Sequence, residues 1–178
     1  MSGINIKELC KQLRADGKHG AVLWTREESK HYLSNRHYAV RFNELPKEVL
    51  ITLFSIFCKV AEVGETLFSQ GGFVVEQPKP VDFSKFYCPE KANINGEKTP
   101  YIRDFGDKKF AAVIKFPNRV SFVDEKYMKL AADVKELKGT DSAFTPLYLA
   151  DDDLMVLPYR TTDNPNFIID LIETEQPA

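Results

Sequence analysis

The chain has 178 residues, of which 43% are apolar, 12% aromatic and 28% charged, and its net charge is −2. The length fits one ordinary domain, and the composition excludes a disordered chain, a collagen and a coiled coil. No run approaches the roughly 18 apolar residues of a membrane helix, and no apolar leader follows the first methionine. We therefore expect a cytoplasmic, globular protein that does not enter a membrane.

Charge is unevenly distributed along the chain. Residues 1–37 carry a net charge of +3, residues 38–140 carry +2 and residues 141–178 carry −7. An acidic end repels nucleic acid, so any contact with DNA has to lie elsewhere. The three cysteines are widely spaced, which fits a reducing compartment and argues against a paired-cysteine zinc or redox motif.

The N-terminal part predicts a helix followed by short strands. Apolar residues at three- and four-residue steps predict a short helix over residues 4–15, ended by Gly17 and Gly20. The polar segment 26–36 leaves room for a second helix, and the alternating segment 38–42 predicts a half-buried strand.

An apolar helix is predicted next, over residues 49–60, with Pro46 at its entry. It is apolar on most sides, so it is expected to be covered on two faces, with Cys58 in the core. Short strands are predicted over residues 66–68 and 72–75.

Residues 76–109 show little periodicity and contain four prolines. Such a stretch either hides short strands or forms an inserted binding loop. Its aromatic residues are expected to anchor the loop, or else to contact a partner, since binding surfaces are rich in aromatic residues. The candidate partner-binding residues here are Phe83, Phe86, Tyr87 and Tyr101.

The C-terminal half predicts a helix over residues 125–138, capped by Asp124, among four strands. The strands are expected over residues 110–116, 120–123, 144–150 and 154–159. The predicted class is α+β: an antiparallel sheet with two main helices on one face and a short N-terminal helix. The similar element order of residues 38–75 and 110–160 predicts two pseudo-repeats.

The expected domain organisation has three parts. Residues 1–37 are a helical and polar N-terminal extension, and residues 38–160 are the α+β core with an insertion at 76–109. Residues 161–178 are an acidic C-terminal tail that contains one apolar run, 167–172.

Catalytic and metal-binding signals are weak. No phosphate loop, dinucleotide glycine pattern or nucleophile elbow is present. His31 and His37 are six residues apart, which does not match a helical zinc pair, and Asp151 to Asp153 fit a turn better than a calcium loop. We expect no enzyme, metal or cofactor, with a metal-dependent hydrolase around the two histidines as an alternative.

The C-terminal half resembles the last domain of bacterial DNA sliding clamps. The resemblance is carried by three stretches: Val120–Leu130, Thr145-Pro-Leu-Tyr-Leu149 and Leu154-Met-Val-Leu-Pro-Tyr-Arg160. It implies a clamp-type domain of two pseudo-repeats whose closing strand lines an apolar pocket for short peptides. Carried over by position, the pocket residues are Val156, Leu157, Pro158 and Tyr159, with Arg160 at the edge.

The sequence therefore favours a non-enzymatic protein-interaction module that binds or mimics a component of DNA replication or repair. The alternative in the same class is a small inhibitor or adaptor that engages a host factor through residues 76–109. A phage or mobile-element origin is compatible with this alternative. A homo-oligomer is compatible with the clamp resemblance, since clamps form closed rings.

Overall fold

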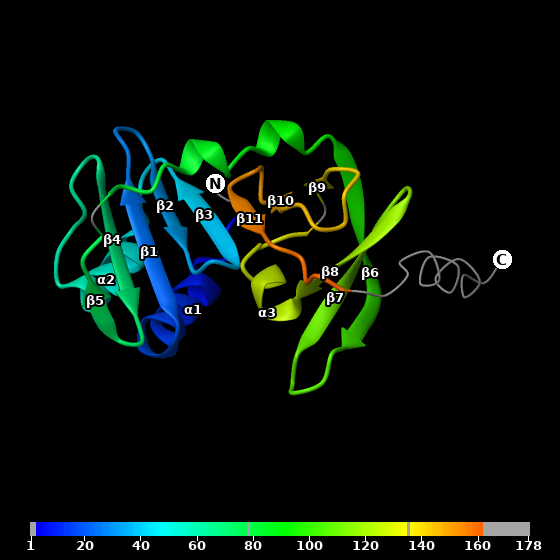
Figure 1. Cartoon of the computed structure of the whole chain (residues 1–178), viewed down its shortest axis with the longest axis horizontal. Coiled ribbons are helices and arrows are strands. Elements are labelled where there is room, and N and C mark those ends of the chain that lie inside the picture. Colours follow the sequence, from blue (N-terminus) through cyan, green and yellow to red (C-terminus); the bar gives the residue numbers. More distant parts are fainter. Residues whose placement is uncertain (1–2, 78, 135, 162–178) are drawn as a thin grey trace.

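The computed structural model describes residues 3–77, 79–134 and 136–161 of the chain. Within them the chain forms an α+β structure whose eleven strands make one antiparallel sheet, in the order β5-β4-β1-β2-β3-β11-β10-β9-β6-β7-β8 (Figure 1). The strands are β1 Ala21–Arg26, β2 His31–Ser34, β3 Tyr38–Phe42, β4 Glu65–Gln70, β5 Phe73–Val75, β6 Ile94–Asp104, β7 Phe110–Phe116, β8 Arg119–Asp124, β9 Leu137–Gly139, β10 Leu147–Leu149 and β11 Leu154–Val156. The helices are α1 Ile6–His19, α2 Lys47–Phe57 and α3 Glu125–Met128, with 3-10 turns η1 Phe83–Lys85 and η2 Pro89–Lys91. The predicted class and the antiparallel sheet are confirmed.

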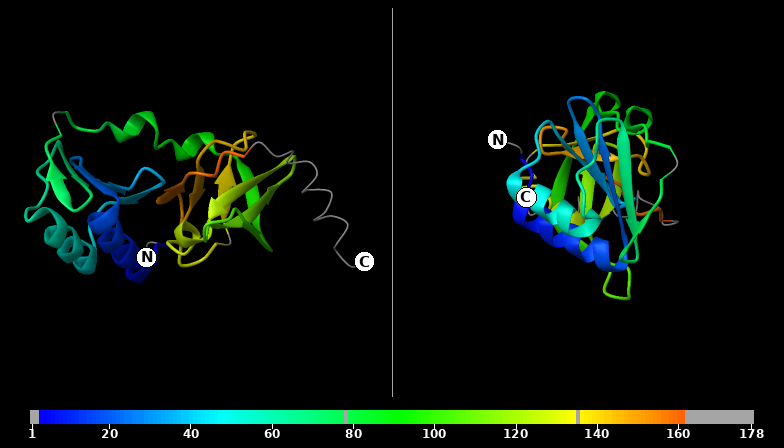
Figure 2. Two further views of the ribbon diagram at one scale, coloured as in Figure 1. Left: turned by 60° about the horizontal axis from the view of Figure 1, so that its bottom comes forward. Right: turned by 90° about the vertical axis from the view of Figure 1, so that its left-hand side faces the viewer.

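The helices α1 and α2 lie side by side on one face of the β1–β5 part of the sheet (Figure 2). Helix α1 begins where the Asn5 side chain accepts a hydrogen bond from the Glu8 N–H at 3.3 Å, and it ends at Gly20. Gly17 lies inside the helix, so the prediction that it ends the helix is wrong. A Cβ at this position would lie 3.0 Å from Ile56 of α2. The absent side chain therefore lets the two helices approach closely.

Helix α2 departs from its prediction at its end and on its outer face. It follows Pro46, as predicted, but it ends at Phe57, and Cys58 takes a left-handed conformation with φ of 55°. Cys58 is exposed, so the predicted core position is wrong. Ile51 and Phe54 are 58% and 53% exposed, so the helix is covered on one side only.

Residues 26–36 do not form the helix considered from the sequence. They contain β2, which pairs with β1 and β3. Tyr32 and Leu33 are both buried but belong to different apolar clusters, one on each face of the sheet. A short strand buried on both faces lacks the alternation that marks a half-buried strand, and this explains the wrong prediction.

The helix predicted over residues 125–138 is also wrong beyond its first turn. Asp124 caps it as predicted, but the helix ends at Met128. The Leu130 carbonyl then accepts from the Asn5 N–H at 2.7 Å, and the Ala132 N–H donates to the Gly3 carbonyl at 2.7 Å. This pairing with the start of the described chain uses backbone groups that a continuing helix would need for itself.

Strand β6 pairs with strands of both parts of the sheet, and the chain after β11 returns to β8. Strand β6 pairs with β9 through residues 94–96 and with β7 through residues 97–104, with a register shift between Lys98 and Ile102. The Tyr159 N–H donates to the Phe122 carbonyl at 2.7 Å, so the chain after β11 contacts the edge of β8 at this residue. Segment 76–109 thus contains the strand that joins the two parts of the sheet.

One apolar core extends through both parts of the molecule. Its buried residues come from α1, α2 and strands on both sides of β3, among them Leu9, Trp24, Leu53, Phe116 and Leu147. The predicted boundary at residue 38 falls between β2 and β3, which are paired neighbours. The apolar run 167–172 and nearly all of the predicted tail lie outside the described residues. In the part of the chain that is described, no helix has the length and apolarity to cross a membrane.

Candidate functional site

The structure places the residues of the clamp-like closing motif in different environments. Val156 is fully buried in β11, opposite Tyr38 of β3. The Tyr159 hydroxyl donates to Asp124 Oδ2 at 2.8 Å, and its half-buried ring packs on Phe105. The accessible members of the motif are Leu157, Pro158 and Arg160.

The loop aromatics divide into anchors and exposed residues. Phe83 and Tyr87 are buried against Tyr32, with ring centroids 4.5 and 5.5 Å away. Phe86 and Tyr101 are exposed, the first beside η1 and the second in β6. The structure therefore supports the anchoring role for two of the four candidates and does not gather all four on one surface.

The two histidines considered for metal binding have separate surroundings. The Trp24 Nε1–H donates to His31 Nδ1 at 3.2 Å, and burial, with a smaller effect of Arg26, lowers the pKa of His31. The His37 ring stacks on Tyr127 with centroids 5.8 Å apart. Among residues 3–77, 79–134 and 136–161, no three His, Cys, Asp or Glu side chains are grouped so that they could hold a metal ion.

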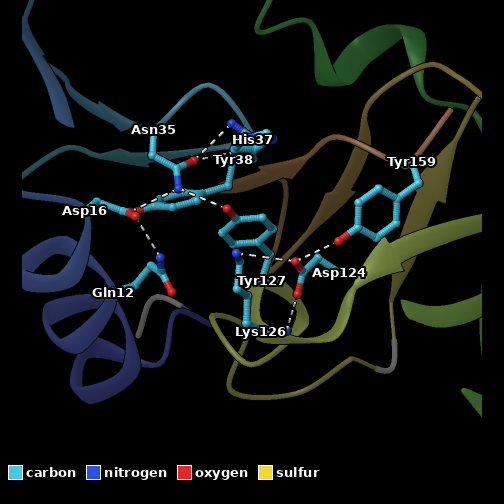
Figure 3. Close-up of polar contacts among 9 residues, drawn as sticks. All are labelled: Gln12, Asp16, Asn35, His37, Tyr38, Asp124, Lys126, Tyr127 and Tyr159. Carbon is cyan, nitrogen blue, oxygen red and sulfur yellow. Dashed lines mark hydrogen bonds and ion pairs between the residues drawn. The ribbon is translucent and has the colours of Figure 1, made fainter. Parts of the chain in front are cut away.

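A polar network centred on Asn35 joins α1, the β2–β3 turn and α3 (Figure 3). Asn35 Oδ1 accepts from the N–H groups of His37 and Tyr38 at 2.9 and 3.1 Å. Asn35 Nδ2 donates to Asp16 Oδ2 at 3.0 Å and to the Tyr127 hydroxyl at 3.2 Å. The buried amide thus uses both its donors and its acceptor within the protein. The network is suited to holding three elements in place, and Asn35 has no donor left for a ligand.

Asp16 is the acidic member of this network and borders a surface pocket of about 420 Å³ that His19, Arg36 and His37 also line. Burial raises the pKa of Asp16, although hydrogen bonds from Gln12 and Asn35 and the charge of Lys126 oppose this rise. Sequence reasoning missed both Asp16 and Asn35. The only signal was a Ser34-Asn35-Arg36 run typical of a turn.

The raised pKa of Asp16 predicts a pH-dependent stability. Between the ordinary pKa of 3.8 and the higher folded value, the folded state binds more protons than the unfolded state. The contribution of Asp16 to the free energy of unfolding is therefore largest below pH 3.8, and it is lost as the pH rises through the pKa of the folded state. We expect the free energy of unfolding of the wild type, minus that of Asp16→Asn, to fall over this interval and then level off. Urea denaturation at a series of pH values measures the difference, and a constant or rising difference would contradict the prediction.

The strand β5 forms an exposed and apolar edge of the sheet. Phe73, Val74 and Val75 are 76%, 55% and 42% exposed, and the described residues pair β5 with β4 alone. The two strands are joined by Gly71 and Gly72, whose φ values of 58° and 86° fit a type I′ turn. The opposite edge, β8, is contacted at Phe122 by the chain around Tyr159.

A hollow of about 630 Å³ lies at the far end of β5. Its walls combine β4, β5 and the loop before β4, and its apolar lining includes Val63, Leu67, Val75 and Pro80. Lys59, three glutamates, Thr66 and Gln77 also line it, so the hollow has a mixed polar and apolar lining.

Comparison with protein-family models, with curated proteins and with solved structures finds no match to this chain. The functional assignment therefore depends on the geometry described above.

Proposed function

We propose that this chain is a protein-interaction module that acts by binding and not by covalent chemistry, and that its partner adds an extended segment to β5. The observation that carries the proposal is the contrast between the two edges of the sheet. One edge is contacted at Phe122 by the chain itself, whereas the other presents three exposed apolar residues. An open apolar edge is a template for a further strand, and proteins commonly bind extended peptides in this way.

The hairpin geometry identifies the backbone groups that a partner strand would meet. Gln70 and Phe73 flank the two-residue turn and form a hydrogen-bonded pair, so Val74, the next residue, directs its N–H and carbonyl away from β4. These groups face the open side of β5. An added strand would bond to them, and the hollow beside Val75 would receive one of its side chains.

Replacing Val74 by proline tests this proposal, because it removes the outward N–H while leaving the β4–β5 pairs on either side intact. Peptides selected for binding to the wild type from a library of extended sequences should bind Val74→Pro at least about tenfold more weakly. The matched control, Val74→Thr, keeps the N–H and the β-branched shape and should bind as the wild type does. Titration calorimetry measures the affinities, and equal affinities for the proline variant would contradict the proposal.

The clamp resemblance adds a partner class that stays a prediction: a replication or repair protein met in the cytoplasm. The clamp-type arrangement of two pseudo-repeats likewise stays a prediction. Of the two main helices expected on one sheet face, the first corresponds to α2, and the second is reduced to the four residues of α3. The motif residues still accessible for such a partner are Leu157, Pro158 and Arg160.

A further inference from the structure

The C-terminal end of α1 and the β2–β3 turn place basic side chains around two neighbouring hollows. The first hollow has a volume of about 480 Å³ and is lined by residues of both α1 and α2. Its ionisable side chains are Arg14, Lys18 and His19, and no aspartate or glutamate of the described part of the chain lines it. A hollow whose ionisable groups are all basic favours an anionic occupant.

The second hollow is the one of about 420 Å³ that Asp16 borders, and it adjoins the first at His19, which lines both. Arg36 and His37 of the β2–β3 turn supply its other basic groups. The two oxygens of the Asp16 carboxylate already accept hydrogen bonds from side-chain amides of the polar network, at 2.9 and 3.0 Å. The two hollows, defined here as the basic hollows, thus combine five basic side chains with one carboxylate that is bonded within the protein.

Two aromatic rings hold the basic groups of the turn in place. The Arg36 guanidinium lies 5.6 Å from the ring centroid of Phe68, and the His37 ring stacks on Tyr127 (Figure 3). Arg36 has a φ of 75°, a left-handed conformation that arginine rarely adopts, and the His37 N–H that follows is bonded to Asn35. A guanidinium that lies over a ring still has N–H groups to offer an anion. Because these groups are already positioned, they lose less conformational freedom when a ligand binds.

Stabilisation of α1 does not account for the whole arrangement. Basic residues in the last turn of a helix oppose the partial negative charge of its carbonyls, and this explains Lys18 and His19. It does not explain Arg36, which belongs to a different element. Within residues 3–77, 79–134 and 136–161, no carboxylate forms an ion pair with Lys18, His19 or Arg36.

We propose that the basic hollows bind an anion with two or more phosphate groups, one phosphate beside Lys18 and the next beside Arg36, with His19 between them. A phosphate carries up to about two negative charges, so neighbouring phosphates match five basic side chains better than a single carboxylate does. Arginine and lysine are also the usual phosphate-binding residues. The phosphates belong to a free phosphorylated molecule or to a nucleic-acid strand, which share this chemistry. The site does not use the outward groups of β5, so it is independent of strand addition.

Tripolyphosphate is the first probe, because it contains phosphate and no base, sugar or lipid. We expect it to bind the full chain saturably in titration calorimetry at about 0.1 M sodium chloride, where charges more than about 10 Å apart are screened. Lys18→Gln/Arg36→Asn removes one cation from each hollow and should bind at least about tenfold more weakly. Asparagine tolerates the left-handed conformation at this position. The matched control, Lys7→Gln/Lys11→Gln, removes two charges of α1 outside the hollows and should bind as the wild type does.

The histidines provide a second measurement, on the wild-type chain. His19 and His37 line the hollows, whereas His31 begins β2 at the end away from the turn and is bonded to Trp24. In a proton–carbon NMR titration, tripolyphosphate should shift the ring Cε1–H signals of His19 and His37 and leave that of His31 unchanged. Equal shifts of all three signals, or none at His19 and His37, would overturn the proposal.

A single-stranded oligonucleotide distinguishes the two sources of phosphate. Binding that tripolyphosphate displaces would support the site and assign it to a nucleic-acid strand, whereas binding of tripolyphosphate alone would assign it to a free phosphorylated molecule. Equal affinities of the wild type and Lys18→Gln/Arg36→Asn for both probes would overturn the site, as would an equal loss in the control variant. Val74→Pro should bind tripolyphosphate as the wild type does, so that failure of the phosphate site and failure of strand addition are told apart.

Discussion

Replacing Asn35 with alanine should lower the free energy of unfolding by about 2–4 kcal/mol. The side chain is 7% exposed and accepts from two backbone N–H groups while donating to Asp16 and Tyr127. Alanine leaves the buried Tyr38 N–H and its neighbour without their acceptor, and an unpaired buried donor is penalised more than the bond itself contributes. Urea denaturation followed by far-UV circular dichroism measures the change.

Two variants separate the loss of the network from the loss of an amide. Asn95 is exposed in β6, so Asn95→Ala should change stability by less than about 0.5 kcal/mol. Asn35→Asp keeps the acceptor for the turn but places a second carboxylate against Asp16, so it should destabilise at neutral pH and recover on acidification. A cost for Asn35→Ala as small as that for Asn95→Ala would show that the network does not hold the elements together.

Local periodicity was sufficient to predict several strands together with the faces they present. The alternation in residues 38–42 placed Tyr38, Val40 and Phe42 on one side and Ala39 on the other, and the structure assigns these sets to different apolar clusters. The half-buried character predicted for this strand is wrong, because Ala39 is buried as well. The same reasoning predicted β7 and the turn at Asp151 to Asp153. These elements are determined by neighbours in sequence, which a single chain displays directly.

The polar network could not be predicted because it is made by contacts between distant residues. Asn35 bonds to Asp16, 19 residues before it, and to Tyr127, 92 residues after it. The helix predicted beyond Met128 was wrong for the same reason, since backbone pairing with Gly3 and Asn5 replaced the helix that the apolar spacing favoured. In both cases tertiary contacts overrode a local pattern that pointed to a helix or to a solvated segment.

The ring of Phe116 is packed tightly between two glycines of neighbouring strands. A Cβ at Gly96 of β6 would lie 2.7 Å from this ring, and one at Gly139 of β9 would lie 2.9 Å from the ring and 2.7 Å from Arg119 Nη2. The ring cannot move away freely, because the Arg119 guanidinium lies 3.6 Å from its centroid. Arg119 is itself fixed by donating from Nε to the Thr140 carbonyl at 2.8 Å, and burial lowers its pKa to about 10.

Gly96→Ala and Gly139→Ala should therefore each destabilise the fold by about 2 kcal/mol, through overpacking of one shared ring. Because either methyl group already forces Phe116 to shift, the double variant should cost about 1 kcal/mol less than the sum of the two. The control is the Phe116→Leu background, in which the smaller side chain leaves room and each glycine substitution should cost clearly less than in the wild type. Denaturant unfolding of the wild type and the six variants gives the coupling energy directly. Strict additivity, or equal costs in the leucine background, would mean that the glycines are required for another reason than the approach of Phe116.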